Sequence, residues 1–345
     1  MTKQIHIGGV PIGGGAPVST QSMCNTPTED VEATVAQIHR LEQAGCDIIR
    51  VAVPNKEAAR AVGAIKERIS IPLVVDIHFD YRLALEAVAA GADKVRINPG
   101  NIGGEDRVKA VAQACRAKGV PIRIGVNGGS LEKGLLEKYG GVTPEALVES
   151  AFGHIALLNK FDFDDICVSL KSSDVRTTMA AYRLMSERSG YPLHLGVTET
   201  GTRRMGAIKS AVGIGGLLGF GIGDTLRVSL SADPVEEVYA ARDILKALGI
   251  RKDGPDLISC PTCGRTKIDL IGLAEEVERR LQAVDKPITV AVMGCVVNGP
   301  GEASAADVGI AGGDGVGLLF RKGEIVKKVP QERLVDELFA LIDTL

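Results

Sequence analysis

The chain has 345 residues, which is enough for one large domain and a smaller one. Its hydrophobic fraction of 45% and charged fraction of 24% are typical of a soluble globular protein. A formal net charge of -3, an aromatic content of 3% and no tryptophan argue against a nucleic-acid-binding protein, which would need a basic stripe or aromatic stacking platforms.

The N-terminus and the cysteines indicate where the protein works. Residues 1–6 lack the charged-then-apolar build of a signal peptide, and no apolar run of about 18 residues could span a membrane. The seven cysteines are scattered and odd in number, which predicts reduced thiols. We therefore expect a cytoplasmic protein without a membrane partner. Four isolated cysteines are assigned to packing: Cys24, Cys46, Cys115 and Cys167.

Short apolar segments alternate with helical segments throughout residues 1–248. A glycine- and proline-rich opening, residues 5–18, is expected to form a hairpin that plugs one end of the domain. Strands are expected at residues 17–23, 46–53, 72–79, 94–99, 121–127, 165–171, 192–200 and 224–231, each followed by a helix. Eight such units over about 240 residues predict a (β/α)8 TIM barrel. An open doubly wound sheet, the main alternative, usually has fewer strands and a glycine-rich fingerprint after the first one.

Polar residues lie near the ends of these strands, although parallel strands buried on both faces are almost continuously apolar. The C-terminal ends of barrel strands form the active-site mouth. Any one of these residues could belong to a structural ion pair instead, but their recurrence in seven of the eight strands predicts a site. They are Asp76 and His78, Arg96 and Asn98, Arg123 and Asn127, Ser169 and Lys171, and Arg227 and Ser229, with Arg50 and Glu199 at comparable places.

The charges at this predicted mouth indicate the kind of ligand. Five cations, contributed by four arginines and Lys171, face only two carboxylates, Asp76 and Glu199. Guanidinium groups bind phosphate oxygens in a two-pronged manner, so the surplus predicts a ligand with several negative charges, such as a diphosphate. Glu199 and His78 are candidates for moving a proton, whereas Asp76 can hold a hydroxyl group or orient an arginine.

The glycine-rich segment 213–224 precedes the last expected strand and has two interpretations. Its backbone N–H groups could form a phosphate-binding nest. Glycine-rich turns also end helices tightly, which is their more frequent use. The sequence alone leaves both interpretations open.

A second domain, residues 249–345, follows a change in composition after Leu248. Residues 249–255 combine glycine, proline and charged residues and are typical of a linker. Beyond them the sequence predicts helices at about 270–284 and 331–345, and strands at 288–293, 316–320 and 324–326. We therefore expect a TIM barrel at residues 1–248 followed by a small α+β domain.

Three cysteines in the second domain predict a metal centre. Cys260 and Cys263 are separated by two residues, so a tight turn can bring both sulfurs to one side, and Cys295 lies in a glycine- and proline-rich loop. No fourth cysteine lies within reach and no histidine follows position 194, so any further ligand is of another kind, such as an oxygen. Structural zinc normally has four Cys or His ligands. An iron–sulfur cluster with one reactive iron is favoured, and zinc, a redox dithiol and inert thiols remain alternatives.

Motifs spread along the whole chain resemble those of one known enzyme family. They are QSM at 21–23, DIHF at 76–79, RINPG at 96–100, RIGVN at 123–127, VTETG at 197–201, LRVSL at 226–230 and GCVVNGPGE at 294–302. In this order they resemble the 4-hydroxy-3-methylbut-2-enyl diphosphate synthase family, in its compact two-domain bacterial form. The resemblance implies an iron–sulfur oxidoreductase of non-mevalonate isoprenoid biosynthesis. Its reaction would be the reductive ring opening and dehydration of 2-C-methyl-D-erythritol 2,4-cyclodiphosphate.

The resemblance also implies a cofactor and a set of site residues. A [4Fe–4S] cluster would be held by Cys260, Cys263, Cys295 and Glu302, and would deliver electrons one at a time. The catalytic residues would be Glu199, His78 and Asp76. The substrate would be bound by Arg50, Arg96, Asn98, Arg123, Asn127, Ser169, Lys171, Arg227 and Ser229, and by Asn298 from the second domain.

Partners follow from the same resemblance. The family takes electrons from flavodoxin or ferredoxin, and it forms a homodimer in which one subunit's cluster domain closes over the other's barrel. Two other functions remain open from the residues alone. A phosphate- or pterin-binding barrel transferase with a zinc-stabilised second domain would share the cationic mouth and need no redox metal. A non-enzymatic iron–sulfur carrier would have no use for five cations at a barrel mouth.

Overall fold

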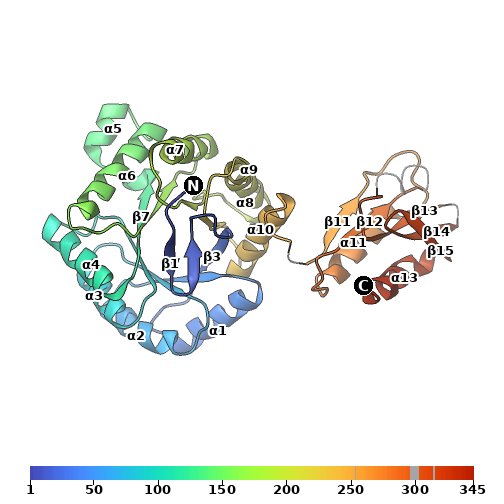
Figure 1. Cartoon of the computed structure of the whole chain (residues 1–345), viewed down its shortest axis with the longest axis horizontal. Coiled ribbons are helices and arrows are strands. Elements are labelled where there is room, and N and C mark those ends of the chain that lie inside the picture. The colour runs from blue at the N-terminus through green and yellow to red at the C-terminus, as the bar shows by residue number, and fades with distance from the viewer. Residues whose placement is uncertain (253, 296–302, 314) are drawn as a thin grey trace. The chain divides into compact units, whose positions relative to one another are not determined.

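The computed structural model describes residues 1–252, 254–295, 303–313 and 315–345. It divides into two compact units, Met1–Ile250 and Arg251–Leu345, and the boundary expected from the sequence lies after Leu248. Figure 1 shows a barrel in the first unit and a sheet with helices in the second. No helix within the described residues is long and apolar enough to cross a membrane.

The first unit is built around a parallel barrel. In residues 1–252, eight strands are hydrogen-bonded in the order β8-β7-β6-β5-β4-β3-β10-β9. An isolated parallel bridge between Val168 and Leu193 links the two ends of this sheet, so the barrel closes and the TIM-barrel prediction is confirmed. The strands are β3 (Ser19–Met23), β4 (Ile48–Ala52), β5 (Leu73–Asp76), β6 (Lys94–Ile97), β7 (Ile122–Asn127), β8 (Ile166–Lys171), β9 (His194–Leu195) and β10 (Thr225–Leu226).

Helices cover the outside of the barrel (Figure 1). Several begin at a capping side chain: Asp30, Thr143 and Asp233 each accept a hydrogen bond from a backbone N–H two or three residues later. The helices are α1 (Val31–Gln43), α2 (Lys56–Lys66), α3 (Tyr81–Ala89), α4 (Glu105–Lys118), the short η1 (Gly128–Ser130), α5 (Lys133–Tyr139), α6 (Pro144–Asn159), α7 (Val175–Arg188), α8 (Arg203–Ser210), the π-helical η2 (Ala211–Gly215), α9 (Gly216–Gly219) and α10 (Pro234–Ala247).

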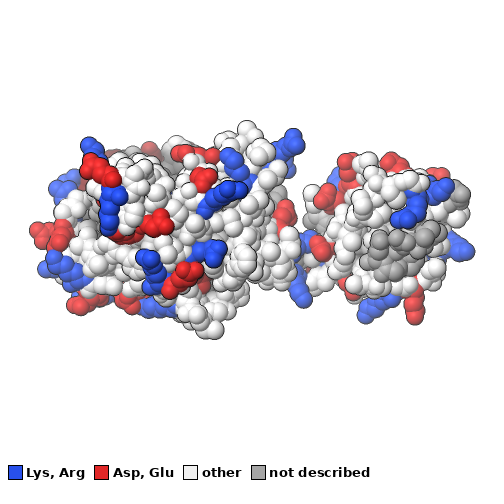
Figure 2. All heavy atoms as spheres, turned by 90° about the horizontal axis from the view of Figure 1, so that it is seen from above, with Lys and Arg blue, Asp and Glu red and all other residues white. Residues whose placement is uncertain are grey.

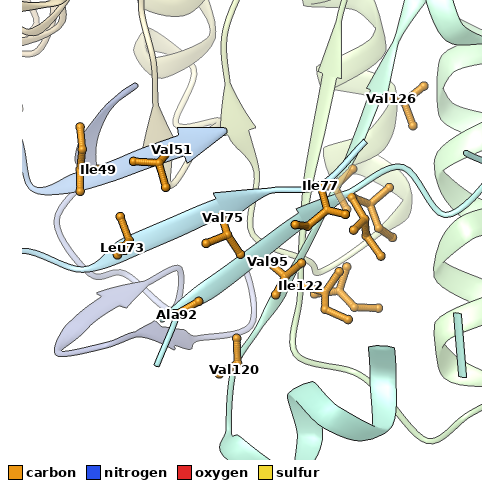
Figure 3. Packing of buried hydrophobic residues seen from close by; sticks show 14 of the residues in the cluster. Ile49, Val51, Leu73, Val75, Ile77, Ala92, Val95, Val120, Ile122 and Val126 are labelled. Atoms are coloured by element: carbon orange, nitrogen blue, oxygen red, sulfur yellow. The ribbon is translucent and has the colours of Figure 1, made fainter. Parts of the chain in front are cut away.

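The barrel strands separate an apolar outer layer from a polar interior. Ile49, Val51, Val75 and Val95 are fully buried and belong to the hydrophobic core that the strands share with the helices (Figure 3). Because successive residues of a strand point to opposite sides, the residues between them face the inside of the barrel. Arg50, which lies between Ile49 and Val51, is one of these. This alternation explains how charged residues occur within buried strands.

An N-terminal hairpin closes the end of the barrel at which the strands begin. β1 (Ile5–Ile7) and β2 (Val10–Ile12) pair antiparallel, and their isoleucines pack with Ile48, Val74 and Cys167 from the strand starts. This is the plug expected from the sequence. The hairpin does not cover the opposite end, where the strands finish and a cavity lies.

The last two strands of the barrel are shorter than expected from the sequence. β9 and β10 contain two residues each and do not extend over 192–200 and 224–231. The chain turns away beyond β9, where Glu199 has a left-handed φ of 54°. Of the two interpretations of the glycine-rich segment, the structure favours the helix end, because residues 213–219 are helical in η2 and α9 and the Gly221 and Ile222 N–H groups donate back to the Leu218 and Leu217 carbonyls. A Cβ on Gly213 would lie 2.7 Å from Val197 Cγ2, so this glycine allows close packing of the helix.

The second unit is the expected α+β domain, described here by itself. Within its described residues, a five-stranded mixed sheet has the order β11-β12-β13-β14-β15, with the first three strands parallel. Two of these strands, β11 and β13, were not expected from the sequence. The elements are β11 (Asp256–Ser259), α11 (Leu270–Leu281), β12 (Thr289–Met293), β13 (Val308–Gly312), β14 (Val316–Arg321), β15 (Glu324–Pro330), η3 (Gln331–Arg333) and α13 (Leu334–Asp343).

Candidate active site at the barrel mouth

A cavity of about 170 Å3 lies at the C-terminal ends of the barrel strands. All its lining residues except Thr198 were predicted as site residues. Thr198 was missed because its neighbour Glu199 was taken as the polar residue at the end of this segment. The cavity is lined by Arg50, Asp76, His78, Arg96, Arg123, Asn127, Ser169, Lys171, Thr198, Arg227 and Ser229.

Some predicted site residues lie elsewhere. Asn98 is 5% exposed and does not line the described cavity, and its side chain accepts a hydrogen bond from the Gly100 N–H at 3.1 Å. It therefore shapes the loop after β6. Glu199 is exposed beside Thr198, and its left-handed backbone is of the kind that often marks functional sites. Asn298 and Glu302 fall outside the residues that the structure describes.

The strand register explains why residues far apart in sequence converge. Arg96 on β6 is the register partner of both Asp76 on β5 and Arg123 on β7. Asn127 on β7 is likewise paired with Lys171 on β8. Residues in register on neighbouring strands point to the same side of the sheet. Asp76, Arg96 and Arg123 therefore lie side by side inside the barrel, and Asn127 and Lys171 form a second pair, four residues beyond Arg123 along β7.

Asp76 is the carboxylate at the centre of the cavity. Its oxygens lie 3.0 Å from Arg96 Nη1 and 3.8 Å from both Arg50 Nε and His78 Nε2. Burial alone would raise the pKa of Asp76, but the neighbouring Arg50 and Arg96 outweigh burial and lower this pKa to about 2. Asp76 is therefore ionised at neutral pH, where it orients guanidinium groups and has no proton to donate.

The Arg227 side chain is held in place by a carboxylate on a helix, Glu237 of α10. Glu237, in the first turn of α10, is 4% exposed and accepts hydrogen bonds from Arg227 at 3.1 and 3.2 Å. Glu237 also accepts the Leu230 N–H at 2.9 Å, which fixes the loop after β10. On the other side, Met23 Sδ lies 2.8 Å from Arg50 Nη2 and 3.7 Å from Arg227 Nη1. Neither Glu237 nor Met23 was predicted as a site residue.

The inside of the barrel mouth has more cationic side chains than carboxylates to pair with them. Arg123 is 1% exposed, and its Nε and Nη1 have no hydrogen-bond partner in the described residues. Burial and the neighbouring Arg96 lower the pKa of Arg123 to about 10, and burial also holds the pKa of Lys171 well below its usual value. On the face shown in Figure 2, basic and acidic residues of the barrel unit are interspersed. The mouth, unlike this face, has a surplus of cations, which fits an anionic ligand.

Two glycines inside the barrel make room for the cations. A Cβ on Gly125 would lie 2.5 Å from Arg96 Nε, and a Cβ on Gly196 would lie 2.6 Å from Lys171 Nζ. Gly125 lies in β7 between Arg123 and Asn127, and Gly196 directly follows β9, so the guanidinium and ammonium groups fill the space that a side chain would take. The sequence signal was a glycine between two inward polar residues, as in Arg123-Ile124-Gly125-Val126-Asn127.

The cysteines of the second unit lie on loops that leave neighbouring strands. Cys260 follows β11 and Cys295 follows β12 by two residues, and these strands are parallel partners. Cys260 Sγ accepts a hydrogen bond from the Gly294 N–H at 3.1 Å, which brings the two loops together. Cys263 is exposed, and a hydrogen bond from the backbone of Arg265 lowers the pKa of its thiol. In the described part of the chain, no three Cys, His, Asp or Glu side chains are already gathered for metal binding.

This donor set nevertheless fits an iron–sulfur cluster. Its three thiols are unbridged, and backbone N–H groups point to Cys260 and Cys263, as is usual around cluster sulfurs. The described residues supply no histidine beside them, and the loop with Glu302 lies outside the described residues.

Fold and site together define a class: a (β/α)8-barrel enzyme whose cationic C-terminal mouth fits a polyanion. A family model described as the GcpE TIM-barrel domain matches residues 2–242, and one described as the GcpE protein C-terminal domain matches residues 256–344. The chain belongs to the GcpE family of 4-hydroxy-3-methylbut-2-en-1-yl diphosphate synthases.

Relatives of known name agree with this assignment over the whole chain. The protein of Caldanaerobacter subterraneus subsp. tengcongensis is 61% identical over 99% of this chain and 97% of its own length. The protein of Geobacter sulfurreducens is 60% identical over 99% and 97%, and that of Clostridium perfringens is 59% identical over 100% and 99%. All three are named 4-hydroxy-3-methylbut-2-en-1-yl diphosphate synthase (flavodoxin).

Solved structures show the same barrel in distant proteins. The dihydropteroate synthase of Yersinia pestis aligns with a TM-score of 0.52 at 15% identity, over 73% of this chain and all of that one. A type I 3-dehydroquinate dehydratase of Clostridium difficile aligns with a TM-score of 0.51 at 14% identity, over 72% and 97%. Such low identity shows the fold alone, so it gives no support to the barrel-transferase alternative.

Proposed function

We propose that this chain catalyses the reductive ring opening and dehydration of 2-C-methyl-D-erythritol 2,4-cyclodiphosphate to 4-hydroxy-3-methylbut-2-enyl diphosphate in non-mevalonate isoprenoid biosynthesis. Two electrons and two protons enter, and water leaves. The observation that carries the proposal is the mouth itself, where Arg50, Arg96, Arg123, Lys171 and Arg227 surround one ionised carboxylate. A cyclic diphosphate supplies the negative charge that this mouth lacks.

The described residues divide into binding and proton-transfer roles. Arg123 and Lys171 lack a carboxylate partner among the described residues and bind the phosphate oxygens. Asp76 keeps Arg96 in place and remains ionised throughout. His78, whose side chain is 53% exposed, and Glu199 at the rim are the groups that can pass protons to the substrate. Asn127, Ser169 and Ser229 supply neutral hydrogen-bonding groups to the same cavity.

The cofactor in this proposal is a [4Fe–4S] cluster held by Cys260, Cys263, Cys295 and Glu302. It supplies single electrons, which are delivered by flavodoxin or ferredoxin in the cytoplasm. Asn298, on the same loop as Glu302, is proposed as a further substrate contact.

Metal analysis of protein purified without oxygen tests this function. We expect about four iron atoms and about four acid-labile sulfides per chain, as one such cluster contains. Reduction with dithionite should bleach the visible absorption, and the reduced protein should convert the cyclic diphosphate to the linear one. Zinc without sulfide, together with no turnover, would contradict the proposal and favour a transferase.

The proposal includes a homodimer, and an apolar helix face offers a surface for it. Met205, Ile208 and Val212 lie three and four residues apart along α8 and η2, and they are 49%, 48% and 55% exposed. Replacing Ile208 with glutamate should shift the protein from dimer to monomer in light scattering, because a charge would be buried in the interface. Lys118→Glu on the exposed end of α4 is the control. A monomeric wild type would refute the dimer, and an unchanged dimer in the variant would exclude this surface.

A further inference from the structure

A lysine lies inside the barrel, beneath the cavity. Lys94 is the first residue of β6 and is fully buried. It precedes Arg96 by two residues, so both side chains point inward, with Lys94 one layer closer to the plugged end. It does not line the described cavity and was not predicted as a site residue.

The groups around Lys94 come from the neighbouring barrel strands and offer little negative charge. The Gln21 Oε1 on β3 is 3.4 Å from its Nζ, and no described carboxylate forms an ion pair with it. Burial and then Arg123 and Arg50 lower the pKa of Lys94 to about 7, although the Cys167 thiol acts in the opposite direction. The groups that face this layer are Gln21 of β3, Arg50 of β4, Val74 of β5, Arg123 of β7, Cys167 of β8, and His194 and Thr225 of β9 and β10.

Arg123 connects this layer to the ligand. It lines the cavity, and among charged groups it has the largest effect on Lys94. A phosphate group that pairs with Arg123 would offset the repulsion between the two cations. The same phosphate would attract a proton to the amine below.

Proton uptake by Lys94 would offset negative charge that the proposed reaction brings to the mouth. The cyclic substrate is a dianion, because each of its phosphates has one acidic oxygen. Ring opening frees a third acidic oxygen. Of the two protons that enter with the two electrons, one is given up again by this oxygen, so the dianion becomes the linear trianion and water with a net uptake of one proton. The negative charge at the mouth therefore increases during turnover.

We propose that Lys94 is the charge-compensating residue of the barrel, which is only partly protonated at neutral pH while the mouth is empty and takes up a proton when a diphosphate dianion binds above it. The inference rests on the proposed function, because that function supplies the ligand. Lys171 and His78 line the cavity and are the competing proton acceptors. The experiment must separate these three groups.

Calorimetric titration of the oxidised protein with the cyclic diphosphate tests the inference, because no turnover occurs without a reductant. Binding enthalpies in HEPES, Tricine and Tris at pH 8 give the number of protons taken up. If binding raises the pKa of Lys94 from about 7 by about two units, the wild type takes up about 0.8 proton more than Lys94→Met. Lys118→Met, which removes an exposed charge from α4, should take up as many protons as the wild type.

The outcomes separate the inference from the proposed function. Equal proton uptake by the wild type and Lys94→Met would overturn the inference and assign the proton to Lys171 or His78. No binding of the cyclic diphosphate to the wild type would overturn the proposed function as well. A second test needs no variant: wild-type uptake should be larger at pH 8 than at pH 6, where Lys94 is already charged. Larger uptake at pH 6 than at pH 8, which is expected for a histidine with an ordinary pKa of about 6.5, would also overturn the inference.

Discussion

Replacing Arg123 with methionine is expected to weaken binding of the cyclic diphosphate by about 100-fold, which corresponds to about 2.7 kcal/mol. Arg123 is a buried cation at the floor of the cavity, and two of its nitrogens lack a partner in the described residues. Charged hydrogen bonds to phosphate are worth about 1.5–3 kcal/mol each, so a two-pronged contact would account for a loss of this size. Calorimetry on the oxidised protein measures it.

The same substitution should make the empty protein more stable. An unpaired guanidinium inside a barrel costs free energy, and an apolar side chain of similar length removes that cost. We therefore expect a higher melting temperature for Arg123→Met without ligand, and a smaller increase on adding ligand. Arg116→Met, at an exposed position on α4, should change neither value. Unchanged affinity in Arg123→Met would remove this residue from the binding site.

Replacing Cys263 with alanine is expected to reduce turnover at least 100-fold, because a cluster that loses one of its thiolate ligands is not retained. Iron and sulfide per chain should fall together with activity. Circular dichroism should stay unchanged, because Cys263 is exposed and does not belong to the sheet core. The matched control is Cys115→Ala, which truncates a buried thiol of α4 and should keep iron and sulfide. Full iron content in Cys263→Ala would contradict the ligand assignment.

The barrel could be predicted because its strands and helices repeat with clear apolar patterns. The ends of its last strands could not be predicted, because their polar residues continue after the hydrogen-bonded pairing stops at Leu195 and Leu226. In the second unit, β11 is largely exposed and β13 contains two glycines, so neither has the apolar alternation that identifies a strand. Both strands form because the sheet supplies their partners.

The candidate site was predictable to the extent that its residues are polar and lie near the ends of strands. Glu237 was not predicted because an acidic residue in the first turn of a helix is common, and only the folded structure shows that it faces Arg227. Lys94 lies at the start of its strand, where a lysine is usually exposed. Gly125 and Gly196 matter because they have no side chain, which leaves room for the Arg96 and Lys171 side chains. A search for polar residues in strands does not identify such glycines.

These two glycines also restrict how the family can vary in evolution. A side chain at position 125 would occupy the space of the Arg96 guanidinium, and one at position 196 would displace the Lys171 amine. Each glycine and its cation should therefore change together or not at all. A relative with alanine or a larger residue at either position would be expected to carry a shorter partner and to bind a different ligand.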